Sequence, residues 1–166
     1  MAYFLPEHKP EELMALAWLL EDGSQNFYEA ISNKLEAREG VSLFKGLMAD
    51  EEKHKESIFQ LYREASGLKA DPGFPGSVVA GEPGEAYMEG GIRVNEALEW
   101  VKERGLKDIL EFSIAREVDS EDLYIKMERK VEDEKAKNSF RVLAEQEKNH
   151  LEILSSVFEK HLGREQ

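Results

Sequence analysis

The sequence predicts an all-α protein in which four long helices pack into one bundle. Four segments place apolar residues at helical spacing and are rich in Glu, Lys, Leu and Ala, which favour helix. These segments cover roughly residues 10–37, 41–65, 106–131 and 134–161. Between the second and third of them, the glycine- and proline-rich segment 66–91 interrupts the helical pattern. The 166 residues are enough for a single domain with one hydrophobic core.

The connections between the helices predict two antiparallel hairpins joined by a long crossover. The first hairpin covers about residues 10–65 and the second about residues 106–161, because only short turns separate the helices of each pair. The connection 66–105, which contains a short amphipathic helix, can run the length of a bundle whose helices measure about 39 Å. A linker between two separate hairpins is the alternative, but one hairpin buries too little apolar surface to be stable alone.

Charge and composition exclude several classes of function. The formal net charge of −13 argues against binding to nucleic acid, because contacts with phosphates need a basic surface. The absence of cysteine excludes disulfides, thiolate zinc sites and iron–sulfur clusters. No apolar run approaches the roughly 20 residues of a membrane span, and no signal-peptide pattern opens the sequence. We therefore expect a cytoplasmic protein without a membrane partner.

The two predicted hairpins are related by an internal duplication. The string FKGLMADEEKH, which begins at Phe44, and the string FRVLAEQEKNH, which begins at Phe140, share Phe, Leu, Glu and His at the same spacing. A constant shift of 96 residues superimposes one hairpin on the other without an insertion. The shift pairs Glu21 with Glu117, Tyr28 with Tyr124, Glu51 with Glu147 and His54 with His150.

The duplicated polar residues occupy core-facing positions. In each helix, the residues at alternating steps of three and four are apolar at both ends and polar in the middle. Four carboxylates buried at one level of a bundle cannot all stay ionised unaided, because desolvation and mutual repulsion each destabilise them by several kcal/mol. Protonation would relieve some of this, but no core-facing position holds Lys or Arg, and divalent cations balance the charge best.

A dinuclear metal site accounts for these residues. Glu-x-x-His places both side chains on one face of a helix, one turn apart, so that both can bind one ion. The predicted ligands, the Glu/His cluster, are Glu21, Glu51, His54, Glu117, Glu147 and His150. Their four carboxylates, two neutral imidazoles and two divalent ions sum to zero charge. A charged bundle with an accidental repeat is the alternative, and Glu121, one turn after Glu117, is an open candidate for the same site.

Two tyrosines are candidates for orienting these ligands. Tyr28 lies about 10.5 Å along the helix axis from Glu21, which is too far for a direct bond. The first and third helices should run antiparallel, and side chains lean toward the N-terminus of their own helix. Tyr28 should therefore lean toward Glu117, and Tyr124 toward Glu21, so that each phenol orients a carboxylate. A core tyrosine with its hydroxyl elsewhere is the alternative.

The duplicated motifs resemble those of the rubrerythrin-like branch of the ferritin-like superfamily over nearly the whole chain, apart from its ends and the crossover. The resemblance rests on Glu21-x6-Tyr28, Glu51-x2-His54, Glu117-x6-Tyr124 and Glu147-x2-His150. It implies a ferritin-like four-helix bundle with a carboxylate-bridged di-iron site. The rubredoxin-like tail of rubrerythrins, which needs cysteines, is missing. Ser120 stands where rubrerythrins carry a further Glu that is associated with their peroxidase activity.

Three functions are compatible with such a site, and the residues leave open whether the protein is an enzyme. The first is a di-iron oxidoreductase, a peroxidase or ferroxidase that reacts with hydrogen peroxide or dioxygen and takes electrons from an external donor. The second is iron binding or storage, and the third is a structural bundle whose metal ions only balance buried charge. Two iron ions suit the ligands best, with manganese or zinc as alternatives. The resemblance also implies a homodimer or a larger homo-oligomer.

Overall fold

A computed structural model describes residues 9–65, 67, 73–75 and 85–164 of the chain. The four predicted long helices are present, and short elements of the crossover join the two hairpins. The elements are α1 (Pro10–Lys34), α2 (Arg38–Ala65), β1 (Tyr87–Met88), the 3-10 helix η1 (Glu89–Gly91), β2 (Ile92–Arg93), α3 (Val94–Val101), α4 (Leu106–Lys130) and α5 (Glu134–Arg164). The turn between α1 and α2 comes slightly earlier than predicted, because Leu35 already has an extended backbone conformation.

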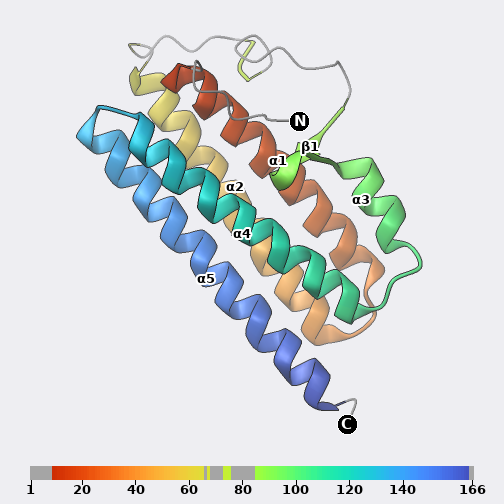
Figure 1. The fold of residues 1–166 in the computed structure, drawn as a ribbon. Coiled ribbons are helices and arrows are strands. Elements are labelled where there is room, and N and C mark those ends of the chain that lie inside the picture. The colour runs from red at the N-terminus through yellow and green to blue at the C-terminus, as the bar shows by residue number, and fades with distance from the viewer. Residues whose placement is uncertain (1–8, 66, 68–72, 76–84, 165–166) are drawn as a thin grey trace.

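The long helices form two antiparallel hairpins, α1 with α2 and α4 with α5 (Figure 1). α2 ends at the end of the bundle where α1 begins, whereas α4 begins at the opposite end, so the chain crosses the length of the bundle between them (Figure 1). α1 and α4 consequently run antiparallel to each other. Parts of the predicted crossover, residues 66, 68–72 and 76–84, lie outside the described residues. The predicted all-α bundle with a crossover is confirmed.

The crossover carries a small β-hairpin that the sequence analysis did not predict. Tyr87 pairs with Arg93 and Met88 with Ile92 in an antiparallel register, and η1 forms the tip; we call residues 87–93 the crossover hairpin. Gly90 has a φ of 81°, a backbone conformation that glycine adopts without strain. The chain then continues into α3, which agrees with the predicted short helix.

The crossover hairpin lies very close to α1 and α4. A Cβ atom at Gly23 of α1 would collide with the backbone carbonyl of Tyr87, and a Cβ atom at Gly90 would collide with the side chains of Arg116 and Asp119 on α4. Arg116 Nη1 also donates a hydrogen bond of 2.9 Å to the backbone oxygen of Glu89. Gly23 therefore permits a close approach of two backbones that a larger residue would prevent, whereas at Gly90 only flexible side chains would have to move.

The bundle core consists of two apolar clusters, and the Glu/His cluster belongs to neither. One apolar cluster includes Leu13, Met14, Ile58, Leu61, Tyr124 and Phe140. The other includes Phe27, Tyr28, Phe44, Leu47, Leu110 and Leu154. Along each long helix the two sets fall on opposite sides of the buried polar residues, as the core-facing pattern of the sequence predicts. Within the described part of the chain, none of the helices combines the length and apolar character that a membrane span needs.

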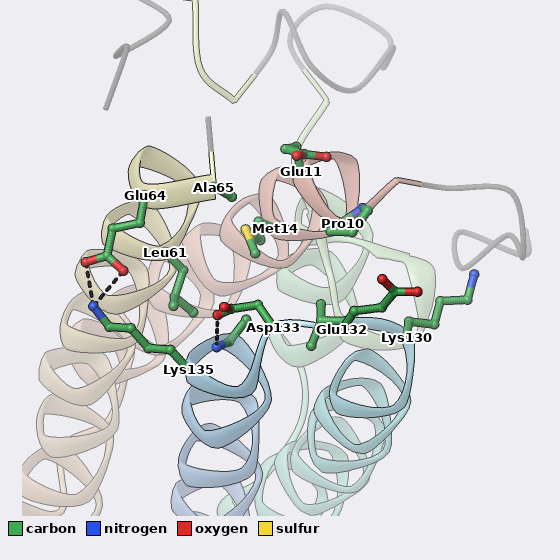
Figure 2. A pocket seen from close by; sticks show the side chains of 12 residues that line it. Pro10, Glu11, Met14, Leu61, Glu64, Ala65, Lys130, Glu132, Asp133 and Lys135 are labelled. Carbon is green, nitrogen blue, oxygen red and sulfur yellow. Dashed lines mark hydrogen bonds and ion pairs between the residues drawn. The ribbon is translucent and has the colours of Figure 1, made fainter. Parts of the chain in front are cut away.

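A cavity of about 640 Å³ opens at the end of the bundle where α1 begins and α4 turns into α5 (Figure 2). Met14 and Leu61 form part of its wall. At its edge Lys135 pairs with Glu64 at 2.7 Å, and the backbone N–H of Ala136 donates to Asp133 at 2.8 Å (Figure 2). No member of the Glu/His cluster lines this cavity, so it is separate from the candidate site.

Candidate metal centre

The six residues of the Glu/His cluster lie together inside the bundle, and each is at most 3% exposed. α1 supplies Glu21 and α4 supplies Glu117, while α2 and α5 each supply a Glu and a His. The spacing of three residues in Glu51–His54 and Glu147–His150 puts both members of each pair on the same face of their helix. Helical periodicity thus directs all six side chains to one level of the core.

The cluster divides into two groups of four residues whose possible ligand atoms all lie within 4.8 Å of one another. The first group contains Glu21, Glu51, His54 and Glu147, and the second contains Glu51, Glu117, Glu147 and His150. We call them the Glu21–His54 half and the Glu117–His150 half. Glu51 and Glu147 belong to both halves, so the two possible ion positions share two carboxylates.

The shared carboxylates turn one oxygen toward each histidine. His54 Nδ1 lies 3.1 Å from Glu51 Oε2 and 2.8 Å from Glu147 Oε1. His150 Nδ1 lies 3.7 Å from Glu51 Oε1 and 3.6 Å from Glu147 Oε2. The opposite oxygens of each carboxylate therefore face opposite halves, which is the arrangement of a carboxylate that bridges two metal ions.

The hydrogen bonds within the protein do not satisfy this cluster. His54 Nδ1 faces three carboxylates, including Glu21 Oε2 at 3.2 Å, yet one ring nitrogen can donate at most one hydrogen bond. Among the described residues, the buried atoms without a hydrogen-bond partner include Glu117 Oε2, both side-chain oxygens of Glu147 and His150 Nδ1. Buried polar atoms normally have a partner. A cation in each half would satisfy these atoms, and their oxygen and nitrogen chemistry fits divalent iron, manganese or zinc.

Burial and the neighbouring charged groups shift the pKa values of the cluster residues. Burial opposes the charged form of His54, but Glu21 and Glu147 raise its pKa to about 11. Burial likewise opposes the charge on His150, and the close carboxylates of Glu117 and Glu147 raise its pKa to about 10. Burial and the charge of Glu147 raise the pKa of Glu117 to about 8. Burial would also raise the pKa of Glu147, but the two histidines hold it below its usual range. Protons on the two histidines and on Glu117 thus offset the negative charge of the buried carboxylates.

The two tyrosines make the predicted contacts across the bundle. The Tyr28 hydroxyl donates a hydrogen bond to Glu117 Oε1, and the Tyr124 hydroxyl donates one to Glu21 Oε1. Glu117 Oε2 and Glu21 Oε2 are left to face the histidines of their own halves. Burial first, and then the neighbouring acids, raise the pKa of both phenols well above the usual value. Both tyrosines therefore stay protonated donors that fix the orientation of a carboxylate.

Sequence reasoning missed Asp50, which contacts the outer nitrogen of His150. Asp50 Oδ2 lies 3.2 Å from His150 Nε2, so Nε2–H can donate to the carboxylate while Nδ1 faces the cluster. A hollow of about 180 Å³, lined by Asp50 and both cluster histidines, opens there between α2 and α5. Asp50 is partly exposed on a highly charged helix, and no pattern in the sequence distinguishes it from its neighbours.

Sequence reasoning also missed Glu89 of the crossover hairpin, which is 3% exposed. The hydroxyl of Ser24, one turn after Glu21 on α1, donates a hydrogen bond to Glu89 Oε2. The open candidate Glu121 belongs to neither half of the cluster, so its place in the sequence does not bring it into the site.

Comparisons with known proteins agree with this architecture. The rubrerythrin family model matches residues 93–165, which contain α3, α4 and α5. A solved structure, the hypothetical protein Pfu-1136390-001 from Pyrococcus furiosus, is 22% identical and superimposes with a TM-score of 0.74, covering 96% of this chain and 94% of that chain. No curated protein matches the chain. The predicted resemblance to rubrerythrins is confirmed over residues 93–165, the bundle fold is shared over nearly the whole chain, and the buried Glu/His cluster fits a carboxylate metal site.

Proposed function

We propose that this rubrerythrin-like chain holds two metal ions, iron in the cell, and uses them for redox chemistry with hydrogen peroxide or dioxygen. One observation carries the proposal. Glu51 and Glu147 each direct one oxygen toward His54 and the other toward His150, as carboxylates that bridge two ions do. Each half would then be completed by its own Glu and His, which supports the six ligands that the sequence predicts.

The ligand set is compatible with redox-active iron. Hard carboxylate oxygens with imidazole nitrogens suit iron and manganese as well as zinc, and bound iron would supply the electrons that reduce peroxide or dioxygen. Tyr28 and Tyr124 would hold the outer oxygens of Glu117 and Glu21, so that the carboxylates need little reorganisation. The hollow beside His54 and His150 is the route by which we expect a small oxidant to reach the site.

The same site has to obtain its electrons from outside the chain. The sequence contains no cysteine, so no iron–sulfur or rubredoxin-type relay can form within it. Repeated turnover therefore requires a separate reductant. The apolar clusters on both sides of the Glu/His cluster would keep bulk water out of the site between turnovers.

The test is an anaerobic titration of the metal-free protein with Fe(II), followed by rapid mixing with hydrogen peroxide or dioxygen. We expect saturation near two irons and oxidation that repeats only with an added reductant. Glu51→Gln should lose one or both ions and the fast oxidation, because a bridging carboxylate is removed. Glu52→Gln is the matched control, since Glu52 is the next residue of α2 but its side chain is half exposed.

Three outcomes would contradict the proposal. Uptake of many irons per chain would indicate storage. Tight binding of two ions that neither oxidant changes would indicate a structural metal. Normal binding and oxidation in Glu51→Gln would remove the Glu/His cluster from the reaction.

A further inference from the structure

The crossover hairpin brings a fifth buried carboxylate to the metal centre. Among the described residues, the only buried glutamates are Glu89 and the four of the Glu/His cluster. No ion pair joins Glu89 to a lysine or arginine in the described part of the chain. A buried carboxylate without a cation is strongly unfavourable, so its retention inside the bundle needs a reason.

Contacts from both hairpins hold Glu89 in place. On the α1 side, the backbone of Tyr87 packs against Gly23, and the Ser24 hydroxyl donates to Glu89 Oε2. On the α4 side, Arg116 donates to the backbone oxygen of Glu89. Met88, the preceding residue, is completely buried. The position of the carboxylate is thus built by the fold and is not a chance contact of a surface loop.

Glu89 belongs to the Glu21–His54 side of the centre. Its hydrogen-bond donor Ser24 lies one turn after Glu21 on the same helix. After burial itself, the charge of Glu21 is the largest influence that raises the pKa of Glu89, and Glu147 adds to it. The shift of 96 residues maps Ser24 onto Ser120, but the crossover has no second copy. In the part of the chain that the structure describes, no buried glutamate therefore takes the corresponding place beside the Glu117–His150 half.

We propose that Glu89 is a seventh protein side chain of the metal centre, a carboxylate that helps to hold the ion of the Glu21–His54 half and not the ion of the other half. This inference rests on the proposed function. Each half offers only four ligand residues, two of them shared, whereas iron and manganese accept more oxygen donors. Ser24 engages Oε2, which leaves Oε1 to turn toward an ion.

Glu89 is not a member of either group of four as its side chain stands, so ion binding has to draw Oε1 inward. The backbone on both sides is already fixed, so it is the side chain of Glu89 that has to move. The consequence is that the two halves, which the duplication would make equal, bind metal unequally. The Glu21–His54 half should fill first.

The test isolates one half at a time with Co(II) as the metal probe, titrated into metal-free protein. Glu117→Gln leaves the Glu21–His54 half, and Glu21→Gln leaves the other half. Adding Glu89→Gln should lower the Co(II) affinity about 10- to 100-fold in the Glu117→Gln protein and should leave it unchanged in the Glu21→Gln protein. The visible absorption of bound Co(II), which reports its coordination, should change only in the former.

Two sets of controls exclude a loss of folding. Glutamine can still accept the hydrogen bond from Ser24, so Glu89→Gln should keep the crossover hairpin in place. Glu85→Gln removes a charge from the same segment, but Glu85 contacts Tyr87 and Arg93 at the surface, so it should not affect Co(II) binding. Ser24→Ala should weaken Co(II) binding in the Glu117→Gln protein, whereas its symmetric partner Ser120→Ala should not.

The outcomes separate this inference from the proposed function. An unchanged Co(II) affinity after Glu89→Gln would overturn the role of Glu89, because it would exclude a contribution to binding. An equal loss in both single-half proteins would also overturn it, because that would indicate a general effect of charge. Failure of the wild-type protein to bind two ions would overturn the proposed function, and this inference with it. A loss confined to the Glu117→Gln protein supports both.

Discussion

Metal binding to the Glu/His cluster should release protons, because the two histidines hold them in the metal-free protein. Neighbouring carboxylates raise the pKa of His54 to about 11 and that of His150 to about 10, so both rings are charged at neutral pH. A metal ion needs the neutral ring and must displace that proton. Glu117, whose pKa is raised to about 8, also carries a proton at pH 7 in most molecules.

The size of the effect follows from these three groups. At pH 7, filling both halves should release roughly two to three protons, so the product of the two apparent binding constants should rise about 100- to 1,000-fold per pH unit. The assay is calorimetric titration with Zn(II) in buffers of equal pH but different ionisation enthalpy, from which the number of protons is obtained directly. His150→Gln should lower the release by about one proton.

One result would refute this reasoning. If proton release at pH 7 were well below about one and the affinity did not change between about pH 6 and 8, the histidines would be neutral before the metal binds. It would also exclude protons on the acids around His54 Nδ1, because a metal ion would displace those protons as well.

The pH dependence of stability and two hydrogen bonds give three further tests. Without metal, the melting temperature should fall as the pH rises from about 6 to 9. The two histidines and Glu117 have raised pKa values in the folded protein, and the stability that their protons contribute is lost as the pH rises through those values. The lowered pKa of Glu147 affects stability only in acid. Tyr28→Phe should keep two ions but lower metal affinity about tenfold, measured by the same titration, because Glu117 loses its donor. Asp50→Ala should weaken the ion beside His150 by a similar factor, while Gln146→Ala, at the symmetric position, should not.

The Glu/His cluster was predictable because it depends on local spacing and on repetition. Glu51 and His54 lie three residues apart, which fixes their common face on any α-helix. The duplication then supplies the second pair at Glu147 and His150 and relates the two hairpins in space. The cross-bundle contact of Tyr28 with Glu117 followed from the antiparallel direction of α1 and α4. These features need only helical periodicity and chain direction.

Glu89 and Asp50 were not predictable in this way. Glu89 lies in a segment without helical periodicity, and its strands of two residues are too short to show an alternating pattern. Its hydrogen-bond donor Ser24 is 65 residues away in the sequence. Gly23 is in the middle of α1, where glycine weakens a helix, and its role becomes clear only when the backbone of Tyr87 lies against it. Such contacts depend on tertiary packing and leave no mark in local spacing.

The duplication explains why any difference between the two halves has to come from residues outside the six of the Glu/His cluster, such as Asp50 and the crossover. Both hairpins supply the same ligands, because the shift of 96 residues maps Glu21 and the Glu51–His54 pair onto Glu117 and the Glu147–His150 pair. A change confined to one copy could also make the halves unequal, but the cluster residues are identical in type in the two copies. The crossover lies between the two copies, packs against α1 at Gly23 and, among the described residues, brings a buried carboxylate to one side only. Under the role proposed for Glu89, the connection between the hairpins is therefore a source of inequality between the two halves that the duplication alone would not produce.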